Sequence, residues 1–290
     1  MNVRKLSLSR RSVTLAAAAW VGVVSLAIGA HAALNMRSLD AAKATEAAQS
    51  VDASNKPSRI ALVIGNGHYP DASAPLTQSI NDARGLTTAL RRNGFDVDVI
   101  EDASKDDMTR AVARLKARVK PDSVVMLFFG GYGIQVGRES YMIPVDAAIW
   151  KESDVRRNGV SVESVLEVMK ENGACAKLVV LDASRRNPYE RRFRGFSHGL
   201  APIAAPDNAL ILSSATPGRV ADDGKGANSV LVTELLTNIN AQVEKASGAE
   251  AVFNQTRTAI ARASDGAQVP TVSSSLLEDV SLAASDKAGG

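Results

Sequence analysis

The sequence predicts an α/β domain built on a mainly parallel sheet with helices on both faces. Short apolar runs alternate along the chain with segments of helical periodicity, an order that favours parallel strands joined by helices. Two of these runs, Val124–Phe129 and Leu178–Leu181, are apolar throughout, as strands covered on both faces are. A length of 290 residues with 45% apolar residues suffices for one sizeable core.

The first half of this region predicts strand, helix, strand and helix. The β-branched run Ile60–Ile64 predicts a strand that ends at a Gly-Asn-Gly turn. Apolar residues at helical spacing predict a helix from Ile80 to Arg92, which Asn93-Gly94 closes. Phe95–Ile100 alternates apolar and acidic residues, a pattern typical of a half-buried strand. Ser104 is then expected to cap a helix that runs to about Val119.

The second half adds further buried strands and helices. Val124–Phe129 is the expected central strand, and Ser161–Lys170 is an expected helix with a Ser-x-Glu start. Leu178–Leu181 and Ala209–Leu212 are expected to be buried strands. Two later helices are expected at Val230–Ile239 and Val252–Ala263.

The amino terminus has the composition of an export signal. Four basic residues and no acidic ones precede an uncharged apolar stretch, and Ala30-His31-Ala32 fits a cleavage site. We therefore expect a signal peptide at residues 1–32, whose Ser9-Arg10-Arg11 run resembles a twin-arginine signal, and a flexible linker at 33–58. A domain at 59–282 and a disordered tail at 283–290 are expected to follow. The alternative is an uncleaved membrane anchor. Either way, the domain is expected outside the cytoplasm, in the periplasm of a Gram-negative cell.

Charge and cysteine content exclude some functions. The net charge of +3 comes from the amino-terminal Arg4, Lys5, Arg10 and Arg11, and the rest of the chain is nearly neutral, so we predict no nucleic-acid partner. The single Cys175 cannot form an internal disulfide and is expected to be a small buried hydrophobic residue. No cluster has metal-ligand spacing, so neither a metal nor another cofactor is expected.

Ligand sites of parallel sheets lie beyond the carboxyl ends of the strands. The segments Gly65–Asp82, Gly130–Gln135 and Asp182–Pro188 occupy that position here. These segments also resemble, in order, motifs of the bacterial caspase-like and metacaspase-like peptidases. The matching stretches are Arg59–Asn66, Asn81-Asp82-Ala83, Phe128–Gln135, Tyr141–Asp146, Leu181–Pro188, Gly199-Leu200-Ala201, Ala221–Gly224 with Asn228-Ser229, and Gln268-x-Pro270 with Ser273–Leu276.

The resemblance implies a caspase-like three-layer α/β/α sandwich with a six-stranded, mainly parallel sheet. It also implies descent from cysteine endopeptidases that use a His/Cys dyad. At the two dyad positions this sequence has Tyr132 and Ser184, which lie 52 positions apart, close to the spacing of about 50 in caspases. A phenol is protonated at neutral pH, and a Ser hydroxyl needs a base to become a nucleophile. The pair predicts a site that has lost this chemistry.

Other residues of the expected cleft are retained. By resemblance, Asp82 and Asp182 match the acids that hold a basic substrate side chain, and Gly133 matches an oxyanion-hole donor that needs no particular side chain. The alternative is that Asp82 caps its helix, Asp182 ties down its own loop and the glycines only satisfy a turn. His68, after the first strand, is the candidate replacement base for Ser184; the alternative is a solvent-exposed histidine.

Three functions remain open. The first is an exported, non-catalytic caspase-like protein that binds a peptide or protein with an exposed Arg or Lys. The second is a weak serine-type endopeptidase that uses Ser184, and the third is an interaction scaffold with a filled cleft. A membrane is expected as a partner only if the signal is uncleaved. The basic segment Arg185–Arg194 is expected to be a solvated loop; an acidic partner or proteolytic processing are the alternatives.

Overall fold

The computed structural model describes residues 57–70, 75–184, 200, 202–221, 226–245 and 248–282, with 242–245 described by their backbone alone. Several expected segments lie outside these residues: the signal peptide, almost all of the linker, the carboxyl-terminal tail and the Arg185–Arg194 segment. Of the three histidines, His68 is described, and the other two, His31 and His198, lie outside. Among the described helices, none combines the length and the apolar composition that crossing a bilayer requires.

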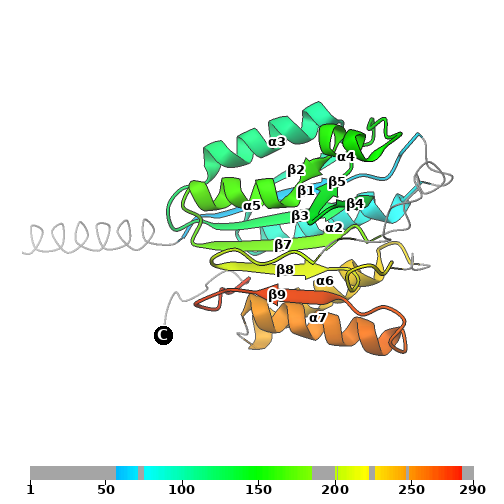
Figure 1. The fold of residues 1–290 in the computed structure, drawn as a ribbon. Helices are drawn as coiled ribbons and strands as arrows, with labels where there is room; N and C mark the ends of the chain where they lie inside the picture. The colour runs from blue at the N-terminus through cyan, green and yellow to red at the C-terminus, as the bar shows by residue number, and fades with distance from the viewer. Residues whose placement is uncertain are drawn as a thin grey trace, which may run out of the picture. The chain divides into compact units, whose positions relative to one another are not determined.

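A six-stranded sheet forms the centre of the domain, in the order β2-β1-β3-β7-β8-β9 (Figure 1). All neighbouring strands are parallel except β9, which pairs antiparallel with β8. The mainly parallel six-stranded sheet is confirmed. The strands are β1 (Arg59–Gly65), β2 (Asp96–Glu101), β3 (Val124–Gly130), β7 (Ala176–Asp182), β8 (Ala209–Ser213) and β9 (Thr271–Ser274).

Helices cover both faces of the sheet, which gives three layers. Alternate residues of each central strand point to opposite faces. In β1, Leu62 and Ile64 pack towards α3 and α5, whereas Ala61 and Val63 pack towards α2, α6 and α7. The helices are α2 (Thr77–Arg92), α3 (Lys105–Arg118), α5 (Val162–Glu171), α6 (Val230–Lys245) and α7 (Ala249–Ala263).

The predicted cap of α3 is present as a reciprocal pair. The Ser104 hydroxyl accepts from the Asp107 N–H, and the Asp107 carboxylate accepts from the Ser104 N–H. The Asp146 carboxylate accepts from the Lys105 N–H at 2.8 Å and satisfies a further donor of the first turn. Asp146 therefore fixes the start of α3 from the far end of the Tyr141–Asp146 motif.

A small second sheet was not predicted. It consists of β4 (Gly133–Val136), β5 (Glu139–Met142) and β6 (Val160–Ser161), in that order, and α4 (Glu152–Asn158) lies close to it along the chain. These strands have two to four residues each and none is a long apolar run, so periodicity could not find them. The sequence also missed β9, whose Thr-Val-Ser-Ser residues are mostly half-buried at the sheet edge.

Ion pairs protect the opposite edge strand, β2. Its three acidic side chains pair with arginines at 2.6 to 2.8 Å: Glu101 with Arg84, Asp98 with Arg114 and Asp96 with Arg118. Charged side chains on an edge strand discourage pairing with another chain.

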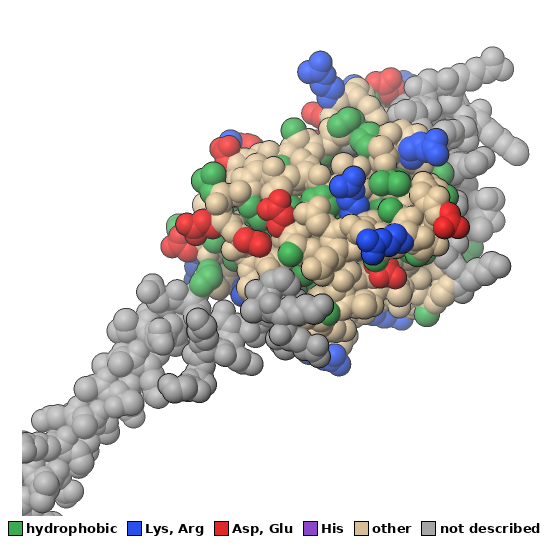
Figure 2. Space-filling view, turned by 90° about the horizontal axis from the view of Figure 1, so that it is seen from below, with side chains coloured by type: hydrophobic (Ala, Val, Ile, Leu, Met, Phe, Trp, Pro, Cys, Tyr) green, Lys and Arg blue, Asp and Glu red, His purple; other side chains and the backbone are tan. Residues whose placement is uncertain are grey.

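On the face seen in Figure 2, acidic and basic side chains are interspersed, and hydrophobic ones are scattered.

The prediction for Cys175 was wrong. Cys175 is exposed, and its thiol contacts the Asp122 carbonyl oxygen at 3.2 Å. It immediately precedes β7, and the strand begins only at the buried Ala176. The apolar pattern of the strand therefore does not extend to the cysteine.

Candidate functional site

The predicted site residues gather at the carboxyl ends of β1, β3 and β7. Gly65, Gly130 and Asp182 are the last residues of these strands and lie side by side in register. Tyr132 follows β3, and Ser184 follows β7. Asp82 joins them from α2, which packs on the same end of β1 and β3.

The Tyr132 ring is part of a hydrophobic cluster. It is 8% exposed and makes an edge-on contact with Tyr69, with ring centroids 4.7 Å apart at 65°. The Tyr132 N–H donates to the Tyr69 hydroxyl at 3.1 Å, and this hydroxyl donates to the Ile143 carbonyl at 2.9 Å. The same cluster contains Ile134, Ile143 and Val155. The residue at the position that the resemblance assigns to the dyad base is thus a packed aromatic side chain.

Ser184 is held by its backbone, and its hydroxyl is buried. The Ser184 N–H donates to the Ser214 hydroxyl at 3.3 Å, and its carbonyl accepts from the Ala221 N–H at 2.6 Å. The residue is 1% exposed, and Oγ has no hydrogen-bond partner among the described residues. A nucleophilic serine needs a base in hydrogen-bond contact with Oγ. The described residues place no such base there.

The Gly133 amide is engaged within the chain. Its N–H donates to the Ala183 carbonyl at 3.0 Å, directly before Ser184. Oxyanion stabilisation requires donors aimed at the reacting oxygen. In this structure the two amides that the resemblance assigns to that role, those of Gly133 and Ser184, both donate to other groups of the chain. A Cβ at Gly133 would lie 2.9 Å from the Ala183 carbonyl oxygen, so close packing against the backbone also requires glycine here.

His68 is directed towards β2 and not towards Ser184. Its Nδ1 lies 2.6 Å from Asp102 Oδ2, and Asp102 Oδ1 accepts from the N–H groups of His68 and Gly67, both at 2.9 Å. Burial alone would raise the pKa of Asp102, but these bonds outweigh it and lower the pKa. The His68 side chain is 65% exposed. Because β3 separates β1 from β7, the structure does not bring His68 and Ser184 together.

Asp82 and Asp182 form a buried acidic pair. Asp82 is 0% exposed and Asp182 is 1% exposed. Asp82 Oδ1 accepts from Asn228 Nδ2 at 2.8 Å and from the Ser229 N–H at 3.0 Å, whereas Oδ2 has no partner among the described residues. Burial and then the charge of Asp182 raise the pKa of Asp82 to about 6. The Asp182 side chain points to the α2 face because it continues the alternation of Leu178 and Val180.

The close approach of α2 to the end of β1 requires a glycine at position 65. A Cβ at Gly65 would lie 2.6 Å from the Ser79 carbonyl oxygen, and one at Gly130 would lie 3.5 Å from the Ser79 Cα. Ser79 stands one turn before Asp82, on the same face of α2, and its buried hydroxyl also has no partner among the described residues. The absence of a side chain at Gly65 therefore leaves polar groups of α2 next to the strand ends.

Comparison with known proteins matches the caspase domain over residues 58–281. The chain belongs to the caspase domain family. It is 30% identical over 146 residues to the human mucosa-associated lymphoid tissue lymphoma translocation protein 1, and 31% identical over 136 residues to its mouse homolog. These matches cover 49% and 46% of this chain, but only 17% and 16% of the relatives. The chain thus spans less than a fifth of the length of these relatives.

Membership of the caspase domain family confirms the fold predicted from the motifs. For two of these motifs, the structure shows what their side chains hold in place. In Asn81-Asp82-Ala83, the Asn81 amide donates to the Ala227 carbonyl at 2.9 Å, so this motif holds the segment before α6 through two side chains. In Gln268-x-Pro270, the buried Gln268 amide donates to the Ser214 carbonyl at 2.8 Å. Gln268 thereby positions the serine that holds the Ser184 backbone.

Asn66 is a site residue that the sequence did not single out. It is fully buried; Nδ2 donates to the Ile143 carbonyl at 3.1 Å, and Oδ1 accepts from the Ala103 N–H at 2.9 Å. Its own N–H donates to the Gly130 carbonyl at 2.8 Å. Asn66 thus joins the loops that follow β1, β2 and β5 of this caspase domain to the last residue of β3. A polar residue between two glycines at the end of a buried strand was the available signal.

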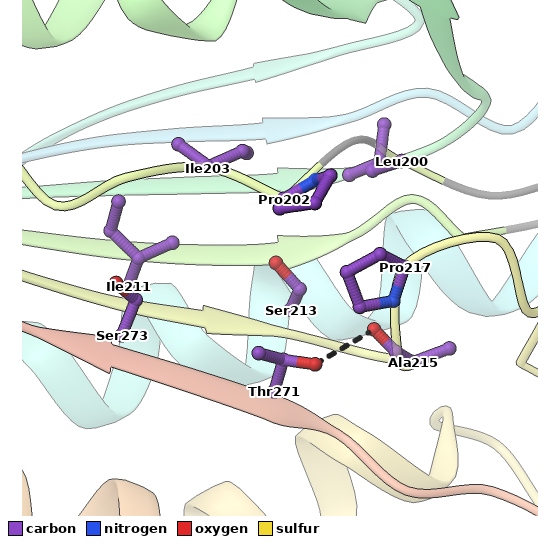
Figure 3. A pocket seen from close by; sticks show the side chains of 9 residues that line it. All are labelled: Leu200, Pro202, Ile203, Ile211, Ser213, Ala215, Pro217, Thr271 and Ser273. Carbon is purple, nitrogen blue, oxygen red and sulfur yellow. Dashed lines mark hydrogen bonds between the residues drawn. The ribbon is translucent and has the colours of Figure 1, made fainter. Parts of the chain in front are cut away.

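A separate pocket of this caspase domain lies over β8 and β9 (Figure 3). Its walls combine the segment around Leu200 and Ile203 with side chains of β8 and β9, and Thr271 Oγ1 donates to the Ala215 carbonyl at 3.5 Å across one end. Neither Tyr132 nor the Asp82–Asp182 pair lines it. Within the described part of the chain, no three His, Cys, Asp or Glu residues are placed to hold a metal ion.

Proposed function

We propose that this protein is an exported, non-catalytic member of the caspase domain family that binds a basic side chain of a peptide or protein partner. The observation that carries the proposal is the buried Asp82–Asp182 pair, in which one Asp82 oxygen lacks a partner among the described residues. Two carboxylates buried together are costly unless a cation neutralises them. A guanidinium or an ammonium supplies both the charge and the missing donors.

Binding of an arginine side chain is the direct test. A blocked peptide with a single Arg is expected to bind the purified protein, and a matched peptide with neutral citrulline is expected to bind much more weakly. Replacing Asp82→Asn is expected to lower the affinity for the Arg peptide about 10- to 100-fold, since a hydrogen bond to a charged group contributes about 1.5–3 kcal/mol. Isothermal titration calorimetry measures both affinities.

The control for this titration is Asp207→Asn, which removes an exposed carboxylate paired only loosely with Lys170, at 3.9 Å. It is expected to bind the Arg peptide like the unmodified protein. Equal affinity for the Arg and citrulline peptides, in both the unmodified protein and Asp82→Asn, would contradict the proposal.

Absence of peptidase activity is the second expected result. Cleavage of peptides with Arg or Lys before the scissile bond is expected to stay at background for both the unmodified protein and Ser184→Ala. The reason is that loss of the nucleophile or the base alone costs about 10⁶-fold in a model serine protease. Here the described residues place no base at Ser184 Oγ, and the Gly133 amide is engaged. Sustained turnover that disappears in Ser184→Ala would instead support a serine-type endopeptidase.

A scaffold with a filled cleft is the second candidate function. Packing of Tyr132 against Tyr69 within a hydrophobic cluster favours it, because the side chain occupies space at the dyad position. The scaffold predicts that a protein partner binds equally well to the unmodified protein, Asp82→Asn and Asp182→Asn. The Arg-peptide titration therefore also separates the two candidates. Export is supported by the basic and then apolar amino-terminal sequence.

A further inference from the structure

The burial of Asp82 and Asp182 makes it costly for both carboxyl groups to be ionised at once unless a cation is bound. Asp82 and Asp182 are both buried, and Asp82 Oδ2 has no partner among the described residues. The Ser79 hydroxyl beside them is likewise buried without a described partner. Like charges in such a space favour the state in which one carboxyl keeps its proton. A cation that binds between the two carboxylates compensates their repulsion, so the carboxyl no longer needs to keep its proton.

The other groups around Asp82 do not offer a competing charge. Its direct partners, Asn228 and Ser229, are neutral, and Gly65 and Gly130 have no side chains. α2 packs against β1, β2, β3 and α6, and β3 carries no titratable residue. The described charged side chains of the other three elements are few. Arg59 on β1 bonds carbonyls of Asn93 and Leu282, the three acids of β2 are all paired with arginines, and α6 carries Glu234. On β7 the charged residues are Lys177 and Asp182. Among the described residues, Asp182 is the one whose charge acts on the pKa of Asp82.

We propose that the Asp82–Asp182 pair binds a basic side chain in exchange for a proton, so that capture of the partner is switched on as the pH rises from acidic to neutral. This inference rests on the proposed function and adds its regulation. The step is an exchange without covalent chemistry: the proton on Asp82 passes to the solvent buffer, and the ligand cation takes its place between the two carboxylates.

The size of the effect follows from linkage. With the pKa of Asp82 at about 6, roughly half a proton is released per Arg side chain bound near pH 6, and almost none near pH 8. The affinity near pH 5 is expected to be about 10-fold weaker than near pH 7.5, because only the ionised fraction of Asp82 accepts the cation.

The experiment is calorimetric titration of the blocked Arg peptide near pH 6 in two buffers, phosphate and an imidazole-type buffer, which differ in ionisation enthalpy. Different apparent binding heats in the two buffers measure the released proton. Asp82→Asn, which keeps an acceptor for Asn228 and Ser229, is expected to show weaker binding with no buffer dependence. His68→Gln removes the other titratable pair at this sheet edge and is expected to leave the proton release unchanged.

Three outcomes would overturn the inference. Arg-peptide binding with the same heat in both buffers, or with a proton release that Asp82→Asn leaves intact, overturns the proton exchange while the proposed function stands. Proton release that disappears in His68→Gln would show that the proton comes from the His68–Asp102 pair and not from Asp82, which also overturns the inference. Absence of Arg-peptide binding at every pH overturns the proposed function and this inference together.

Discussion

Asp82→Asn is expected to stabilise the domain at neutral pH, by about 3 kcal/mol in the free energy of unfolding, although it removes a charge from the candidate site. Burial and the charge of Asp182 raise the pKa of Asp82 from 3.8 to about 6. Each pKa unit between folded and unfolded states corresponds to 1.36 kcal/mol, which gives the expected gain of about 3 kcal/mol. Asn retains an oxygen for Asn228 and the Ser229 amide without the buried charge.

The sign of the pH dependence is fixed by the raised pKa. Between about pH 4 and pH 6 the folded protein holds a proton that the unfolded chain has lost, so the stability of the unmodified domain falls as the pH rises through this window. Asp82→Asn lacks this decrease. Its stabilisation is therefore expected to be absent near pH 4 and complete above about pH 7.

Chemical denaturation at several pH values measures this difference, and the melting temperature near pH 7.5 is expected to rise by roughly 6–12 °C. Asp207→Asn, at an exposed position, is the matched control and is expected to change stability by less than about 0.5 kcal/mol. A stabilisation of equal size near pH 4 and pH 7.5, or a loss of stability at neutral pH, would show that the buried charge of Asp82 is not its cause.

Asn66→Ala is expected to destabilise the domain by about 2–5 kcal/mol. The substitution removes the acceptor of the buried Ala103 N–H and the donor to the Ile143 carbonyl. Each buried polar group left without a partner costs about 1–3 kcal/mol, and the lost volume leaves a small cavity. Ile143 keeps the bond from the Tyr69 hydroxyl, which limits the loss at that carbonyl.

Urea denaturation near neutral pH measures this loss, with Asn254→Ala as the control, because Asn254 is exposed and its amide bonds only a carbonyl of its own helix, that of Glu250. The control is expected to change stability by less than about 0.5 kcal/mol. Tyr132 is expected to become more accessible in Asn66→Ala, since the Ile143 amide donates to the Tyr132 carbonyl at 3.0 Å. A change no larger than that of Asn254→Ala would mean that the three loops do not depend on Asn66.

The fold was predictable because its elements repeat a simple pattern over many residues. The apolar runs of β3 and β7 and the helical spacing in α2 are local features, and the structure has each of them in its expected place. The alternation within β7 even places Asp182 on the α2 face. The small second sheet and β9 were missed, because strands of two to four residues with half-buried side chains carry too little pattern.

The location of the candidate site residues was predictable, whereas their contacts were not. The motifs placed Asp82, Tyr132, Asp182 and Ser184 at one end of the sheet, and the structure gathers them there. The partner of His68 is Asp102, a residue with a positive φ of 46° whose side-chain direction depends on its loop conformation. Ser214 and Gln268 were missed because each is a single polar residue whose partner lies 30 or 54 positions away.

By itself, the sequence determined the α/β/α architecture, the family resemblance and which residues stand at the two positions that the resemblance assigns to a dyad, since these depend on residue type and local order. Only the tertiary structure decided that Tyr132 packs into a hydrophobic cluster, that the Gly133 amide is engaged and that Asp82 and Asp182 are buried together. The physical reason is that burial, hydrogen-bond partners and pKa values depend on which distant segments meet. Here Gly65 lets α2 approach the strand ends, and α2 and β7 place two carboxylates in one desolvated space.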